Sequence, residues 1–150
     1  MCDRLVVFAL GDQRYGLPLS AVERIVRAVA VTALPQAPDI VLGVVNVQGQ
    51  LIPVINLRRR FRLAEHEIAL SDQIVIASTS RWTVALVVDA VIGVLEYSKE
   101  EIVAVQGLLP ELRYVEGVVK LDDGLILIHD LDKFLSLEEE AALHLVMESA

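Results

Sequence analysis

The sequence has little of what catalytic and metal-binding sites usually require. Its 150 residues contain one cysteine, Cys2, and three histidines, His66, His129 and His144. A single cysteine cannot form an internal disulfide bond, which fits a reducing compartment, and the histidines lack the spacing of metal ligands. Neither a Gly-x-Ser-x-Gly elbow nor a Gly-Lys-Ser/Thr phosphate loop is present. The sequence therefore predicts no enzyme, no metal site and no cofactor, and we interpret His129 as a core or edge residue of a strand.

Positive charge is also scarce. Thirteen Lys and Arg residues against 21 Asp and Glu residues give a net charge of −8. Such a surface repels phosphate backbones, so nucleic acid is excluded as a partner. The basic residues that do cluster are Arg58, Arg59, Arg60 and Arg62. We interpret them as a solvated helix face paired with acidic side chains.

Long apolar runs are missing as well. The longest, residues 83–95, is interrupted by Asp89 and Gly93, and a membrane-spanning helix needs about 20 apolar residues. The N-terminus has no signal-peptide pattern. We predict a cytoplasmic protein that does not insert into a membrane.

The sequence is instead rich in short runs of Val, Leu and Ile, within a hydrophobic content of 55%. Turn residues separate these runs regularly, which is typical of small β-barrels or a sandwich. The predicted strands cover residues 5–10, 14–19, 29–34, 41–47, 50–56, 73–78, 83–88, 91–97, 115–121 and 125–130.

Helices are expected to be few. A capping box from Ser20 to Glu23 predicts a short helix or helical turn that carries Val22, Ile25 and Val26. Residues 57–63 have helical character, and Ser98 to Glu101 repeats the capping pattern. A third capping pattern, from Ser136 to Glu139, predicts a C-terminal helix with an apolar stripe. The stripe consists of Leu137, Ala141 and Leu145.

Two segments of the chain resemble each other. Residues 43–57 align with residues 117–131, and both begin with Gly-Val-Val. Residues 14–19 similarly align with residues 81–86. We interpret the chain as one domain, residues 1–150, made of two halves of about 70 residues built to one plan. We read Asp122 and Asp123 as the turn of the second hairpin. A groove between two such halves is a natural docking site for another chain.

Several motifs in order resemble the CheW family of chemotaxis coupling proteins. They are Phe8-x-Leu10-Gly-Asp-x-x-Tyr15-Gly-Leu-x-Leu19, Val22-Glu-Arg-Ile25, Gly43-x-x-Asn46-x-x-Gly49-x-x-x-Pro53-Val-x-x-Leu57-Arg58, Val87-Val88-Asp89-x-Val91, and Glu116-Gly117-Val118 with 125–131 and Phe134-Leu135. The resemblance covers about residues 4–146. It implies a mainly β protein with two five-stranded, SH3-like β-barrel subdomains around a shared hydrophobic core, with short helices and a C-terminal helix.

The resemblance also implies a role and partners. CheW-like proteins are non-enzymatic adaptors that join the cytoplasmic tips of chemoreceptors to the regulatory domain of a CheA-type histidine kinase. The receptor-binding groove implied by the resemblance involves Val22, Ile25, Gly43, Asn46, Gln48 and Gly49. We interpret Val22 and Ile25 as partner contacts or as core residues of the short helix. We interpret Gly43 and Gly49 as residues that shape the backbone.

Two positions depart from the family pattern. Gln48 stands where the family usually has arginine, and Asn56 where it usually has aspartate. We hypothesise that the two amides replace an ion pair, which requires Gln48 and Asn56 to lie in side-chain contact. The alternatives are an adaptor of a divergent, non-flagellar chemosensory pathway, or a small-ligand sensor that uses the groove between the barrels.

Overall fold

Eleven strands make up most of the part of the chain that the computed structural model describes, which is residues 2–27, 31–61, 63, 71–79, 81–103, 115–121, 124–133 and 137–149. The strands are β1 Cys2–Leu10, β2 Gln13–Pro18, β3 Val22–Arg27, β4 Val41–Val47, β5 Gln50–Ile55, β6 Gln73–Ser78, β7 Thr83–Val88, β8 Ala90–Ser98, β9 Ile102–Val103, β10 Val115–Leu121 and β11 Gly124–His129. The helices are α1 Leu57–Arg60, α2 Leu137–Ser149 and the one-turn 3₁₀ helices η1 Leu19–Ala21, η2 Lys99–Glu101 and η4 Leu131–Lys133.

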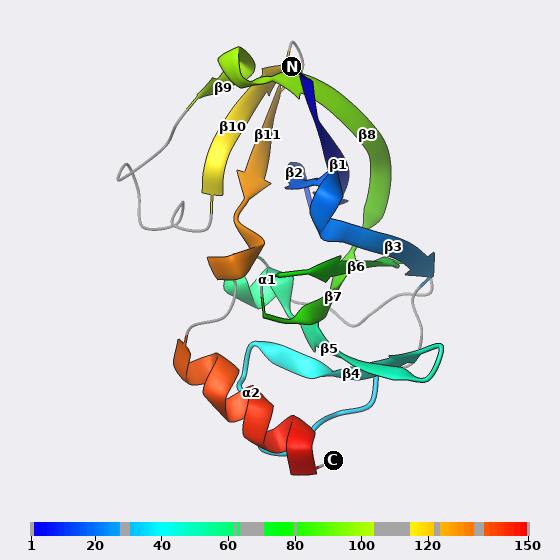
Figure 1. Ribbon diagram of the computed structural model, residues 1–150. Helices are drawn as coiled ribbons and strands as arrows, with labels where there is room; N and C mark the ends of the chain where they lie inside the picture. Colours follow the sequence, from blue (N-terminus) through cyan, green and yellow to red (C-terminus); the bar gives the residue numbers. More distant parts are fainter. Residues whose placement is uncertain are drawn as a thin grey trace.

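The strands form two sheets, one above the other in Figure 1. The six-stranded sheet has the order β8-β1-β2-β11-β10-β9, and the five-stranded sheet has the order β3-β6-β7-β5-β4. The first hairpin of the chain therefore joins strands from its second half, while residues 22–88 build the five-stranded sheet. This arrangement confirms two small β subdomains, with the two-residue β9 as an additional edge strand.

The two hairpins that align in sequence have the same strand register. In the β4–β5 hairpin, Gly43 pairs with Val54 next to an irregularity that follows Val41. In the β10–β11 hairpin, Gly117 pairs with Ile128 next to the same irregularity. The second strand of each hairpin then runs parallel to a further strand, β5 along β7 and β11 along β2. The likeness agrees with a duplication of the two halves, which stays a prediction.

Most strands bury both faces, which explains why their sequences are nearly continuous apolar runs. The central cluster lies between the sheets and consists of Phe8, Leu10, Tyr15, Leu17, Ile40, Val41, Ile55, Leu57, Val75, Ala77, Val84, Leu86, Val88, Leu131 and Leu143. Separate clusters fill the inside of each sheet. On β6, for example, Val75 faces the central cluster whereas Ile74 and Ile76 face the cluster inside the five-stranded sheet.

The C-terminal helix covers the central cluster from the side of the five-stranded sheet. Leu143 is fully buried in that cluster and Met147 packs against it, whereas Leu145 is 66% exposed. The predicted stripe that includes Ala141 and Leu145 is therefore wrong, because apolar residues occur on several sides of this helix and the ion pair of Glu139 with Arg60 fixes which side docks.

Two further predictions were wrong. Residues 22–27 form strand β3 and not a helix, because Val22, Ile25 and Val26 are β-branched and pair along β6. Of the strand predicted over residues 29–34, the described part forms only one bridge, between Thr32 and Val44. The chain then turns at Gln36, whose φ of 66° is left-handed. The Asp122–Asp123 turn and the capping residue Ser136 lie outside the described residues.

Candidate functional site

The β4–β5 hairpin ends in a tight turn that projects Gln48. The φ angles of Gln48 and Gly49 are 52° and 86°. Positive values at both central residues define a type I′ turn, whose twist suits a two-residue hairpin. The Asn46 side chain accepts a hydrogen bond from the Gly49 backbone N–H, with 2.8 Å between Oδ1 and N. Asn46 therefore supports the turn, and the exposed Gln48 side chain lies at its tip.

A β-bulge in strand β3 decides where its side chains point. Val22 pairs with Ala77, and Ile25 pairs with Val75, so Glu23 is the extra residue of the bulge. Without a bulge, residues three apart would face opposite sides of a strand. Here Val22 and Ile25 face the same side, toward the central cluster. Val22 packs against that cluster and Ile25 stays 40% exposed.

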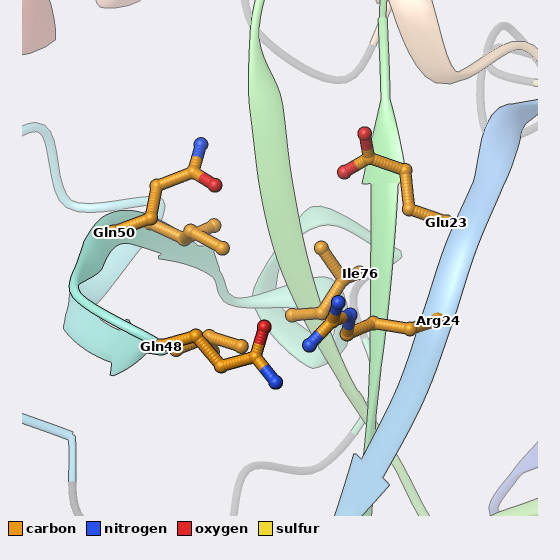
Figure 2. A pocket seen from close by; sticks show the side chains of 7 residues that line it. Glu23, Arg24, Gln48, Gln50 and Ile76 are labelled. Carbon is orange, nitrogen blue, oxygen red and sulfur yellow. The ribbon is translucent and has the colours of Figure 1, made fainter.

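A pocket of about 220 Å³ joins strand β3 to the tip of the β4–β5 hairpin. Its lining consists of Glu23, Arg24, Val47, Gln48, Gln50, Ile52 and Ile76. Figure 2 shows the Arg24 and Gln48 side chains pointing toward each other at one end, with Glu23 and Gln50 at the other. Strands β3 and β4 are opposite edges of their sheet. The sheet therefore curls until its edges approach, as a barrel-like subdomain requires.

A second exposed feature is apolar and lies on edge strands of the two sheets. Ile92 and Val94 on β8, the edge of the six-stranded sheet, are 57% and 58% exposed. Their neighbour Val91 packs against the central cluster, as Val22 does from β3. We call Ile25, Ile92 and Val94 the apolar edge. Large apolar side chains left in water on sheet edges are typical of protein-binding surfaces.

The predicted groove residues therefore do not form one surface. Gln48 reaches the pocket beside β3, whereas Val22 and Ile25 face the other side of that strand. Gly43 is buried, and a Cβ atom there would lie 2.2 Å from the Thr32 carbonyl oxygen. Gly43 thus shapes the backbone, as interpreted from the sequence.

The hypothesis of contact between Gln48 and Asn56 is wrong. Gln48 lies in the hairpin turn, and Asn56 follows the far end of β5. At about 3.3 Å per residue of strand, six residues from Gln50 to Asn56 span about 20 Å. Asn56 instead caps α1, where its side-chain oxygen accepts a hydrogen bond from the Arg59 backbone N–H at 3.1 Å.

Two arginines of α1, Arg58 and Arg60, are paired with acidic side chains, as predicted, but both are mostly buried. Arg60 donates to both carboxylate oxygens of Glu139, at 2.6 and 2.7 Å. Arg58 is paired with Asp89, whose second oxygen accepts a hydrogen bond from the Gly11 backbone N–H at 2.8 Å. The side chains of Arg58 and Arg60 are only 14% and 13% exposed. This cluster therefore ties the two subdomains and α2 together, and is not a solvated face.

Aromatic rings surround His129. Its ring lies 4.9 Å from that of Tyr15 and 4.4 Å from that of Phe61, centroid to centroid, and the residue is 2% exposed. The prediction that His129 is a core residue is confirmed. Burial raises the pKa of the Tyr15 phenol above its ordinary value, and the nearby Arg58 cation lowers it by less.

Within the described ranges, His, Cys, Asp and Glu side chains form no group of three that could hold a metal ion. None of the helices described is long and apolar enough to cross a membrane.

Sequence reasoning missed three of the exposed residues on which the two surfaces depend. Arg24 was not singled out because its placement in the pocket depends on the bulge and on the curl of the sheet. Ile92 and Val94 lie in an apolar run that gave no sign of which residues face water. Only their place on an edge strand leaves them exposed.

Comparisons with known proteins agree on one family. The CheW-like domain family matches residues 4–139. The chemotaxis protein CheW of Rhizobium meliloti is 30% identical over 141 residues, which cover 92% of this chain and 91% of that protein. The chemotaxis protein CheW of Treponema pallidum is 29% identical over 142 residues, with 91% and 84% covered.

A solved structure agrees with this match. The crystal structure of the scaffolding protein TtCheW from Thermoanaerobacter tengcongensis has a TM-score of 0.84 at 30% identity. The match covers 93% of this chain and 96% of the TtCheW chain. This likeness confirms the predicted two-subdomain β fold. The chain belongs to the family of CheW-like domain proteins.

Proposed function

We propose that this protein is a cytoplasmic adaptor of chemotaxis-type signalling that joins chemoreceptor tips to the regulatory domain of a CheA-type histidine kinase. Family membership and the likeness to a scaffolding protein support a chemotaxis adaptor and not an enzyme. The observation that carries the receptor-binding part is the apolar edge, Ile25, Ile92 and Val94, which lies exposed on edge strands of the two sheets.

The apolar edge suits an amphipathic helical partner. Three large apolar side chains, 40% to 58% exposed, lie on edge strands whose neighbours anchor in the central cluster. An amphipathic helix can bury such side chains with its own apolar stripe. The proposed partner is the helical tip of a receptor. In this proposal the signal passes as a change in how the adaptor and its partners dock on one another, without any chemical step.

A ligand-sensing function has less support. The seam between the sheets is filled by apolar side chains of the central cluster. The pocket beside β3 lies within one subdomain, and its 220 Å³ is below the roughly 300–1,000 Å³ of typical small-molecule sites. Both features favour the adaptor.

The test is calorimetric titration with the two proposed partners from the same genome. We expect the regulatory domain of the kinase to bind with micromolar or tighter affinity, about −8 kcal/mol. Ile92→Glu and Val94→Glu should weaken binding of a receptor cytoplasmic fragment at least about tenfold, because a charge replaces buried apolar contact. The kinase affinity should not change.

Leu145→Glu is the matched control, since Leu145 is 66% exposed on α2 and away from the apolar edge. If neither partner binds the folded protein, the adaptor function is wrong. If Leu145→Glu weakens receptor binding as much as Val94→Glu, the apolar edge is not the docking surface.

A further inference from the structure

We infer that Gln73 is a positioning residue of the apolar edge. It fixes the corner at which the chain passes from β7 to β8, and so holds Ile92 and Val94 in place relative to Ile25. This inference rests on the proposed function, because it concerns how the receptor-binding surface keeps its shape. Gln73 acts through the backbone of β8 and not by contact with the receptor.

The apolar edge is divided between the two sheets. Ile25 faces the central cluster from β3 of the five-stranded sheet. On β8 of the six-stranded sheet, Val94 pairs with Val6. Three residues before it, Val91 pairs with Phe8 of the central cluster. Val6 and Phe8 are two residues apart on β1 and face the same side, which puts Val94 on the side of the central cluster as well. A helical partner can contact both parts together only when β8 keeps its position relative to β3.

The chain passes from one sheet to the other at Asp89. Strand β7 of the five-stranded sheet ends at Val88, and β8 of the six-stranded sheet begins at Ala90. The direction of β8 therefore depends on the backbone angles of a few residues at this corner, unless side chains fix it. Asp89 provides one anchor, since it pairs with Arg58 of α1 and accepts a hydrogen bond from the Gly11 N–H.

Gln73 supplies a second anchor, next to β3. The backbone N–H of Val91 donates a hydrogen bond to Gln73, with 2.7 Å between N and Oε1, at a partly buried site. Gln73 is the first residue of β6 and pairs with both Val88 of β7 and Arg27 of β3. Its side chain therefore joins β8 to the strand that lies directly beside β3.

The hydrogen bond of Gln73 lies next to a β-bulge in β8. Two consecutive residues of β1 pair with Gly93 and Val91, so Ile92 between them is the extra residue. A bulge disrupts the hydrogen-bond ladder locally and bends the strand that carries it. At this interruption, Gln73 gives the Val91 N–H a partner. The bond therefore stabilises the bend at which Ile92 is exposed.

The first test measures the position of β8 relative to β3 without any partner. Nitroxide labels are attached to Ile25→Cys and Ile92→Cys, in a chain whose own cysteine is removed by Cys2→Ser. Pulsed EPR then gives the distribution of distances between the labels. We expect Gln73→Met to widen this distribution, because a thioether is only a weak acceptor. Gln73→Glu should keep it narrow, since a carboxylate oxygen accepts the same bond and Arg27 lies opposite to balance the charge.

Gln13→Met is the matched control for the loss of a side-chain amide. The Gln13 side chain donates to the backbone oxygens of Arg14 and Leu125, at 3.1 and 3.2 Å, and so joins β2 to β11 within one sheet. Losing these bonds should leave the label distances unchanged. Equal widening by Gln13→Met and Gln73→Met, or no widening by either, would overturn the inference whether or not the protein is an adaptor.

The second test titrates the unlabelled variants with the receptor cytoplasmic fragment. We expect Gln73→Met to weaken binding about fivefold and Gln73→Glu to restore it to within about twofold, since the change is that of a single hydrogen bond. The kinase affinity should not change. Equal receptor affinities of the wild type and Gln73→Met would overturn the positioning role even if the label distances widen. If the wild type binds no receptor, the proposed function is wrong, and the label distances still decide whether Gln73 fixes the corner.

Discussion

At Gly43, packing leaves no room for a side chain. A Cβ atom would lie 2.2 Å from the Thr32 carbonyl oxygen and 2.9 Å from a methyl group of Val31. The Thr32 backbone also exchanges two hydrogen bonds of 2.9 Å with Val44. Gly43 therefore lets the segment around Thr32 lie directly against β4, which is a structural role and not a partner contact.

Gly43→Ala should lower the free energy of unfolding by about 1–3 kcal/mol, since the bridge between Thr32 and Val44 must move to admit the methyl group. The check is urea denaturation. Gly93→Ala is the matched control, because Gly93 has the same φ of 156° but nothing within 4 Å of an added Cβ. Equal losses for the two variants would show that backbone conformation, and not the close approach, requires glycine.

Tyr15 makes stability depend on alkaline pH. Burial raises the pKa of its phenol in the folded state above the ordinary value of about 10. As pH rises above about 10, the unfolded chain loses this proton first, so the free energy of unfolding falls until the folded pKa is passed. Below pH 10 the contribution is fully present.

Tyr15→Phe should remove this part of the pH dependence while keeping the ring contacts with Phe61 and His129. The measurement is the urea midpoint of both proteins between pH 8 and pH 11. We expect a shallower decline above pH 10 in the variant and parallel behaviour below it. The same slope in both proteins at high pH would contradict the assignment.

At the scale of elements, α2 docks by a face that combines apolar and ionic contacts. Leu143 is fully buried, Glu139 pairs with Arg60 at 2.6 Å, and Glu140 pairs with Arg81 at 3.2 Å. The Glu140 pair is partly exposed on the arginine side and contributes little. The stability of the docked helix therefore depends mainly on Leu143 and on the less exposed pair of Glu139.

Leu143→Ala should destabilise the protein by about 2–5 kcal/mol, as expected for a cavity at a fully buried leucine. Leu145→Ala, on the exposed side of the same helix, should change stability by less than about 0.5 kcal/mol. Thermal unfolding of the two variants gives the comparison. Similar losses at the two positions would mean that α2 does not dock through Leu143.

At the scale of the whole molecule, the two subdomains share one core. The central cluster takes Phe8 and Leu17 from the six-stranded sheet, and Val75 and Leu86 from the five-stranded sheet. Asp89 also connects the two sheets. It pairs with Arg58 in α1, which follows β5 of the five-stranded sheet, and it accepts a hydrogen bond from the Gly11 N–H in the turn between β1 and β2 of the six-stranded sheet. Neither subdomain can leave the other without exposing this cluster to water.

We therefore expect urea to unfold both subdomains in a single transition. Trp82 is the only tryptophan of the chain and precedes β7 of the five-stranded sheet, so its fluorescence reports on that subdomain. Far-UV circular dichroism reports on the strands of both. The two curves should coincide, and an earlier or later fluorescence transition would show that the subdomains unfold separately.

Features that depend on neighbouring residues could be predicted from the chain alone. Turn residues, capping patterns and apolar runs predicted the hairpin of residues 41–56, the capping of Ser98 by Glu101 and the C-terminal helix. The same information indicated the family, and through it the two-subdomain fold. Local sequence determines these features because they form between residues close in the chain.

Features that depend on distant segments were decided only by the tertiary structure. Pairing with β6 makes residues 22–27 a strand and not the predicted helix, and the bulge at Glu23 places Val22 and Ile25 on one side of it. The curl of the five-stranded sheet brought Arg24 to Gln48, and the docking of α2 selected Leu143 over Leu145. In each case several local arrangements have similar energies, and the contacts between segments far apart in the sequence select one of them.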